Sequence, residues 1–224
     1  PRAPLDDDEH ATRILADPSE RDRVLEDHYN LLEVCILCRG ACTAPPAPPG
    51  GHDLEFSSKA ADITISKNVA KCERGIRKEG TAVCKAPRMS RGKHYAEFSL
   101  LRGSNCTVGV CKASLDLRER KLACTTNDGW GYNARTGFMH HGTVRATTRW
   151  TGQKAAREGT IIGMLLDMDA GTLTVYHDGV RIGEMVRTGL KYESLIWMVQ
   201  LTDGAEVRIE KKDPPSGTAA RSSR

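Results

Sequence analysis

The chain has 224 residues, enough for one domain with extensions or for two small domains. Lys and Arg total 33 against 29 Asp and Glu, so the net charge is +4, with both signs interspersed. No apolar run approaches the roughly 18 residues needed to cross a bilayer, and residues 1–10 are acidic rather than positively charged like a secretory signal. We therefore expect no membrane association and a location inside the cell, in the cytoplasm.

Eight cysteines would permit four disulfides, but the chain is too long and too charged for a small disulfide scaffold. We expect reduced thiols. Three cysteines form the pattern CxxCxxxC at Cys35, Cys38 and Cys42, which with a histidine could supply four zinc ligands. A zinc site usually shows a second ligand pair, so we interpret these cysteines as small hydrophobic residues and expect no metal.

The proline-rich stretch at 43–51 predicts an extended linker, because proline lacks the amide donor that a helix needs. Before it, capping residues at 17–20 and apolar residues at helical spacing predict a helix within an N-terminal extension, residues 1–42. After it, ten of the eleven aromatic residues lie between Phe56 and Trp197. We therefore predict one core domain over 52–211 and a disordered tail over 212–224, which has no large apolar residue.

The hydrophobic period changes to two after the linker. Ala96, Phe98 and Leu100 alternate with more polar residues, as expected of a strand with one buried face. The segments 161–166 and 195–201 are apolar at nearly every position, which predicts strands buried on both faces. Asp178-Gly179 between two apolar runs predicts a hairpin. Many short strands without intervening helices indicate an all-β, two-sheet antiparallel sandwich.

An ordered set of short motifs runs through this domain: GKHYAEF at 92–98, VGV at 108–110, GWGY at 129–132, GTIIGMLLD at 159–167, DAGTLTVYHDG at 169–179 and RIG at 181–183. Together they resemble the SPRY domain, and an upstream strand at 63–66 fits the same family. Each motif alone is weak, whereas the ordered set is specific. The resemblance implies a concanavalin-like jelly roll.

The resemblance also implies function. SPRY domains are non-catalytic modules that bind a protein or a short peptide, and they serve as targeting or scaffolding parts of larger proteins, including ubiquitin-ligase adaptors. Partner binding in the family involves loops at one edge of the sandwich. Carried over to this sequence, these loops contain the following residues: Arg74, Arg77, Lys78, Met139, His140, Thr202, Asp203 and Gly204.

Other chemistries have less support. The residues GWGYNA at 129–134 fit a dinucleotide fingerprint, but no helix pattern follows to hold a pyrophosphate, so we expect no cofactor. No serine-hydrolase or metalloprotease motif is present, so we expect no enzyme. Basic clusters lack a groove-reading helix or stacking aromatics, which argues against nucleic acid. The alternative function is a lectin-like sandwich, with a sugar platform formed by Asn127, Asp128, Trp130 and Tyr132.

Overall fold

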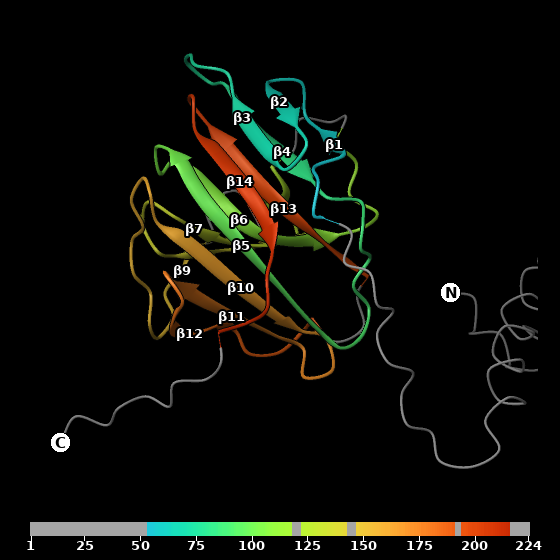
Figure 1. Cartoon of the computed structure of the whole chain (residues 1–224). Helices are drawn as coiled ribbons and strands as arrows, with labels where there is room; N and C mark the ends of the chain where they lie inside the picture. The colour runs from blue at the N-terminus through green and yellow to red at the C-terminus, as the bar shows by residue number, and fades with distance from the viewer. Residues whose placement is uncertain (1–52, 118–121, 143–146, 191–193, 216–224) are drawn as a thin grey trace, which may run out of the picture. The chain divides into compact units, whose positions relative to one another are not determined.

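The computed structural model describes residues 53–117, 122–142, 147–190 and 194–215, and these residues form two antiparallel sheets of seven strands each (Figure 1). Residues 123–125 form a single 3-10 turn, the one helical element among the described residues. The all-β sandwich predicted from the sequence is therefore confirmed. Within the described part of the chain, no helix has the length and apolarity required to span a membrane.

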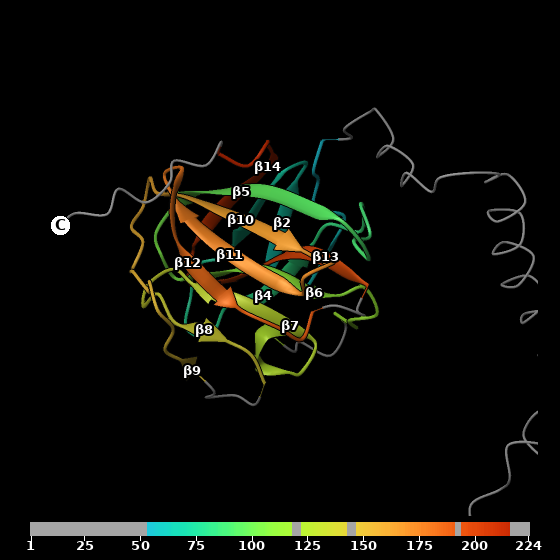
Figure 2. The same ribbon diagram turned by 90° about the horizontal axis from the view of Figure 1, so that it is seen from below.

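The first sheet runs, in spatial order, β1 (Ser58–Lys59), β4 (Glu79–Val83), β13 (Leu195–Thr202), β6 (Cys106–Lys112), β7 (Gly129–Asn133), β8 (Met139–His140) and β9 (Thr147–Thr148). The second sheet runs β12 (Val180–Val186), β11 (Thr172–His177), β10 (Ile161–Asp167), β5 (Lys93–Arg102), β14 (Glu206–Lys211), β3 (Val69–Cys72) and β2 (Ile63–Ser66). Figure 2 shows the two sheets from below, with β8 and β9 at one margin of the first sheet.

The predicted hairpin joins β11 to β12. His177 pairs with Val180, which leaves a two-residue turn of Asp178 and Gly179. Both turn residues have positive φ, 49° and 79°, as the tight hairpin turn requires. The Asp178 side chain also accepts the backbone N–H of Ile161 at 2.9 Å, which ties the turn to β10. The sequence signal and the observed geometry agree here.

Segments 161–166 and 195–201 were both predicted to be strands buried on both faces. The prediction is confirmed for 195–201, whereas the outer face of 161–166 is partly exposed. In β13, every residue from Leu195 to Leu201 is buried, as expected of a strand covered on both sides. In β10 the residues on the inner face are buried, whereas Ile161 is 37% exposed and Leu165 is half-buried. The reason is that the segment after β6, with Leu115 and Leu117, covers the outer face of the first sheet, whereas the outer face of β10 in the second sheet has no such cover among the described residues.

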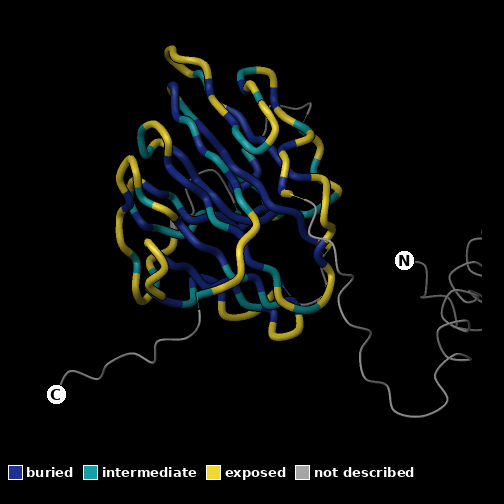
Figure 3. Tube along the Cα trace, viewed as in Figure 1, coloured by how far each residue is buried: buried dark blue, intermediate teal, exposed yellow. Residues whose placement is uncertain are grey.

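The main core lies between the sheets. Alternate residues of β5 and β13 point into it, and the rings of Phe98 and Trp197 meet edge to face at 6.0 Å. Burial of such aromatic side chains supplies much of the hydrophobic stabilisation of a domain this size. Figure 3 shows the strands as buried and the connecting loops as exposed. The loops at the ends of the sandwich are therefore free to differ without disturbing the core.

A second, smaller apolar cluster lies on the outer face of the first sheet. It contains Ile196 and Met198, which alternate with the core residues of β13, together with Val83 of β4. Residues that follow β6, including Leu115 and Leu117, pack against this cluster. Consecutive residues of a strand point to opposite faces, so the continuous apolar run of β13 serves both clusters.

Several predictions fall outside the described residues: the helix within 1–42, the proline-rich linker 43–51, the pattern of Cys35, Cys38 and Cys42, and the tail from 216 onward. Residues 212–215 are described and contain no regular element. The domain limits at 52 and 211 therefore stay predictions.

Candidate interaction surface

Two of the three predicted loop segments meet at one end of the sandwich, where the β3–β4 loop (residues 73–78) lies beside the β13–β14 turn (Figure 1). The Gly75 N–H donates to the Asp203 carboxylate at 3.3 Å. The backbone N–H of Asp203 donates to the Lys78 carbonyl at 3.0 Å, and that of Gly204 to the Glu73 carbonyl at 3.2 Å. These hydrogen bonds hold the loop and the turn as one unit, which we call the loop edge.

Lys78 forms ion pairs at the base of the loop edge. Its ammonium group lies 2.8 Å from the Asp62 carboxylate and 3.1 Å from that of Glu73. The hydrogen bond with Asp62 is the largest cause of the raised pKa of Lys78, followed by that with Glu73. Lys78 therefore fixes the base of the loop, and its predicted contact with a partner, like those of Arg74 and Arg77, stays a prediction.

The tip of the loop carries Ile76, whose exposed fraction of 94% is the highest of the large hydrophobic residues in the described parts of the chain. The exposed residues Arg74 and Arg77 lie on either side of it in sequence. Arg77 has a φ of 63°, a conformation that non-glycine residues rarely adopt. The loop backbone is thus held in an unusual shape that displays one apolar and two basic side chains.

Thr202 connects the loop edge to a third loop. Both its backbone N–H and its hydroxyl donate to the carbonyl of Asn105, at 3.0 and 3.1 Å. Asn105 lies in the short β5–β6 connection, which was not among the predicted site segments. Gly204 is buried with a φ of 74°, and a Cβ there would lie 2.6 Å from the Arg74 side chain. Thr202 and Gly204 are therefore framework residues, and Asp203 is the exposed member of the turn.

The third predicted segment lies elsewhere, and its predicted conformation needs correction. Met139 and His140 form β8, paired with Tyr132 and Gly131, rather than part of a loop. Met139 packs against the main core, so the two residues are held by the sheet. Strands β6 and β7 separate β8 from β13, which places β8 about 14 Å away across three strand spacings of about 4.8 Å. Burial lowers the pKa of His140.

The aromatic platform of the lectin alternative is absent. Trp130 is 8% exposed and Tyr132 is fully buried, so neither ring is open to a sugar. Trp130 stacks on His141 at 4.6 Å, and the hydroxyl of Tyr132 lies 2.7 Å from Nε2 of His177. The residues of the GWGY motif therefore build the fold.

The five cysteines among the described residues are free and buried. Burial raises the pKa of Cys84, Cys106 and Cys111 to about 12 and also raises that of Cys72 and Cys124. A thiol with a raised pKa is rarely ionised near neutral pH and is a poor nucleophile or metal ligand. In the described ranges, no cluster of three or more His, Cys, Asp or Glu residues could hold a metal ion.

A family model for the SPRY domain matches residues 93–213, more than half of the chain. The chain belongs to the SPRY domain family. Members of this family are generally non-catalytic modules of protein–protein interaction. The strands before residue 93, β1 to β4, complete both sheets and supply the β3–β4 loop of the loop edge.

Solved structures of SPRY domains have the same fold. The SPRY domain of human HERC1 is 19% identical with a TM-score of 0.55, covering 65% of this chain and 89% of its own. A human SPRY domain is 18% identical with a TM-score of 0.56, covering 69% and 97%. The TRIM65 PSpry domain is 18% identical with a TM-score of 0.52, covering 70% and 89%. No curated protein matches the sequence.

The family resemblance pointed to the basic residues of the β3–β4 loop, but Ile76 was not among the predicted contacts. A single isoleucine between arginines carries no periodic signal, because exposure depends on where the loop turns. The loop begins after Cys72, the last residue of β3, and the glycine at position 75 breaks the strand pattern. These features indicate a loop, and only the structure shows which side chain reaches its tip.

Proposed function

We propose that this SPRY domain binds a peptide or a folded protein through the loop edge, with Ile76 as the central contact and Arg74 and Arg77 beside it. The observation that carries the proposal is the position of Ile76, 94% exposed at the tip of a loop fixed by hydrogen bonds. One exposed apolar side chain is common on protein surfaces. The fixed backbone and the two flanking arginines distinguish this one.

The fixed backbone favours binding because a preorganised loop loses little conformational entropy when a partner docks. Burying an isoleucine side chain contributes about 1.5 to 3 kcal/mol. Arginine is enriched at the energetic centres of interfaces, where its planar group contacts carboxylates in pairs. The matching partner surface is therefore an apolar pocket with acidic residues at its margin.

A role as a targeting or scaffolding part of a larger assembly, such as a ubiquitin ligase, follows from the family resemblance and belongs to the same proposal. We also propose a cytoplasmic location, which is supported by the five free buried thiols, since reduced cysteines suit a reducing compartment. Met139 and His140 are proposed as a secondary contact only, because β8 is separated from the loop edge.

The test compares proteins captured from cell extract by the full chain and by two variants. Ile76→Asp removes the central contact, and Val180→Asp is the matched control because Val180 is also a largely exposed aliphatic residue, at 67%, in the hairpin of the second sheet. We expect the Val180→Asp variant to capture partners that the Ile76→Asp variant does not, although the two variants have equal melting temperatures. Equal capture by both variants would contradict the proposal.

A further inference from the structure

A cavity of about 650 Å³ opens on the outer face of the first sheet, away from the loop edge. Its lining comes from the end of β1, the end of β4 and the residues after it, the start of β13, and the segment that follows β6. Ile196 and Thr202 are six residues apart in β13, which places the Ile196 end of the cavity about 20 Å along the strand from the β13–β14 turn. At the other end, the lining residue Ala61 precedes Asp62, whose carboxylate pairs with Lys78 of the loop edge. The two surfaces share no residue.

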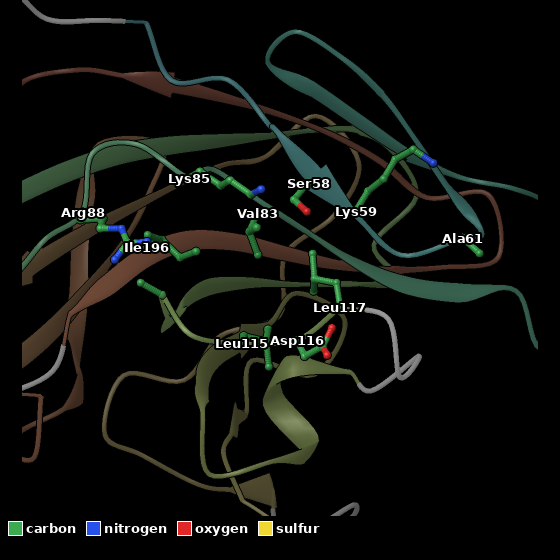
Figure 4. A pocket seen from close by; sticks show the side chains of 11 residues that line it. Ser58, Lys59, Ala61, Val83, Lys85, Arg88, Leu115, Asp116, Leu117 and Ile196 are labelled. Carbon is green, nitrogen blue, oxygen red and sulfur yellow. The ribbon is translucent and has the colours of Figure 1, made fainter. Parts of the chain in front are cut away.

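The floor and one wall of the cavity are apolar. Val83 and Ile196 belong to the second apolar cluster, and each is only 4% exposed. Leu115 and Leu117 pack against that cluster and are partly buried. Figure 4 shows the segment from Leu115 to Leu117 on one side of the cavity, across from Val83. An apolar side chain of a ligand that entered the cavity would be shielded from water by Val83 and Ile196 on one side and by Leu115 and Leu117 on the other.

Three basic residues, Lys59, Lys85 and Arg88, also line the cavity and are exposed. Within the parts of the chain that the structure describes, none of them forms an ion pair. The lining contains one carboxylate, Asp116, which has an interaction of its own. The margin therefore attracts a negatively charged ligand.

The walls are held in place by hydrogen bonds that backbone N–H groups donate. The N–H of Lys85 donates to the Ser57 hydroxyl at 2.9 Å, which joins the end of β4 to the start of β1. Met89, next to Arg88, exchanges two backbone hydrogen bonds with Leu195 at 2.8 and 2.9 Å. The N–H of Ala113 donates to the Ser194 carbonyl at 2.9 Å. Each wall is therefore tied to β13 or its neighbour before any ligand arrives.

We propose that this cavity binds an acidic peptide segment of a partner protein, which inserts one aliphatic side chain against Leu115 and Leu117 while its carboxylates contact Lys59, Lys85 and Arg88. The apolar floor selects a peptide over nucleic acid, because none of the eleven lining residues is an aromatic that could stack on a base. The proposal is independent of the loop edge, since the two surfaces share no residue.

The test measures binding of fluorescently labelled hexapeptides to the full chain by anisotropy. The probe Glu-Asp-Glu-Leu-Glu-Asp is compared with the same peptide carrying serine in place of leucine, and with a single-stranded oligonucleotide. We expect the serine peptide to bind about tenfold more weakly, which corresponds to the loss of one buried aliphatic side chain. Added salt weakens binding of the leucine peptide, as screening requires.

Three charge variants locate the site, and a fourth variant distinguishes it from the loop edge. Lys85→Glu and Arg88→Glu should each weaken binding by about fivefold, in the range of an exposed charge pair. Lys212→Glu is the control, an exposed lysine beyond the last strand with the same change in charge. Ile76→Asp should leave peptide affinity unchanged, which separates this test from that of the loop edge. The proposal is overturned if the leucine peptide does not bind, if all three charge variants weaken it equally, or if the oligonucleotide binds more tightly.

Discussion

The carboxylate of Asp203 accepts a hydrogen bond from the backbone N–H of Gly75 at 3.3 Å, across 128 residues of sequence. This contact joins the turn between the strands β13 and β14 to the loop that presents Ile76. Asp203 has a φ of 42°, so the turn itself has a conformation that favours glycine or asparagine. The exposed loop is therefore positioned by a turn from the far end of the chain.

Asp203→Gly should loosen the β3–β4 loop without disturbing the turn. Glycine accepts the positive φ but removes the carboxylate that holds Gly75. We expect faster hydrogen exchange at the Gly75 amide and a loss of less than about 1 kcal/mol in the free energy of unfolding, since the bond is exposed. Asp203→Asn keeps an acceptor oxygen and should behave like the parent chain. Equal exchange in both variants would show that the contact does not restrain the loop.

Trp130→Ala should lower the free energy of unfolding by about 3 to 5 kcal/mol, because the indole is 8% exposed and packs in the main core. His141→Ala removes only the stacked partner and should cost about 1 kcal/mol. Urea denaturation measures both. A loss below about 1 kcal/mol for Trp130→Ala would mean that the ring is exposed in solution, and would restore the sugar-platform alternative.

Stability should decrease as the pH falls below 6.5, the ordinary pKa of histidine. Burial, with the nearby charge of Lys154, lowers the pKa of His177 in the folded state. The unfolded chain therefore binds the proton first as the pH falls, and the folded state loses stability until the folded pKa is passed. Burial of His140 acts in the same direction. Well above pH 6.5 both states are neutral, and stability no longer depends on the protonation of these groups.

His177→Gln should reduce the slope of unfolding free energy against pH between about 7 and 5, whatever its effect on the stability itself. The parent chain, measured over the same pH range, is the comparison. An unaltered slope in His177→Gln would mean that His177 titrates normally in the folded protein.

Much of the fold could be predicted because its signals are local. The alternation in β5 and the Asp178-Gly179 turn depend on residues that are neighbours in sequence, and both predictions are confirmed. The face exposed at Ile161 could not be predicted, because it depends on the segment after β6 covering one sheet and not the other. The position of Met139 and His140 was missed because β8 has only two residues, too few for a periodic pattern.

The candidate site was only partly predictable for the same reason. Sequence spacing identified the β3–β4 loop and the β13–β14 turn as separate segments, and their contact through Asp203 is a long-range relationship. Lys78 was grouped with Arg74 and Arg77 as a surface charge. Its ion pairs with Asp62 and Glu73 depend on side chains brought together only by folding.

A fragment of residues 52–211 should fold without the preceding residues, because the described strands from β1 to β14 all lie within it. We expect a sheet-type circular dichroism spectrum and one cooperative thermal transition, with a melting temperature close to that of the full chain. A broad, non-cooperative transition would mean that residues before 52 belong to the core.

The most direct test of the loop edge is hydrogen–deuterium exchange of the full chain with and without a partner that it captures. We expect slower exchange in the peptides that cover residues 74–78 and 202–204 when the partner is bound, and unchanged exchange in the hairpin at 178–181. Protection confined to β8, or to any surface that excludes residues 74–78, would contradict the account.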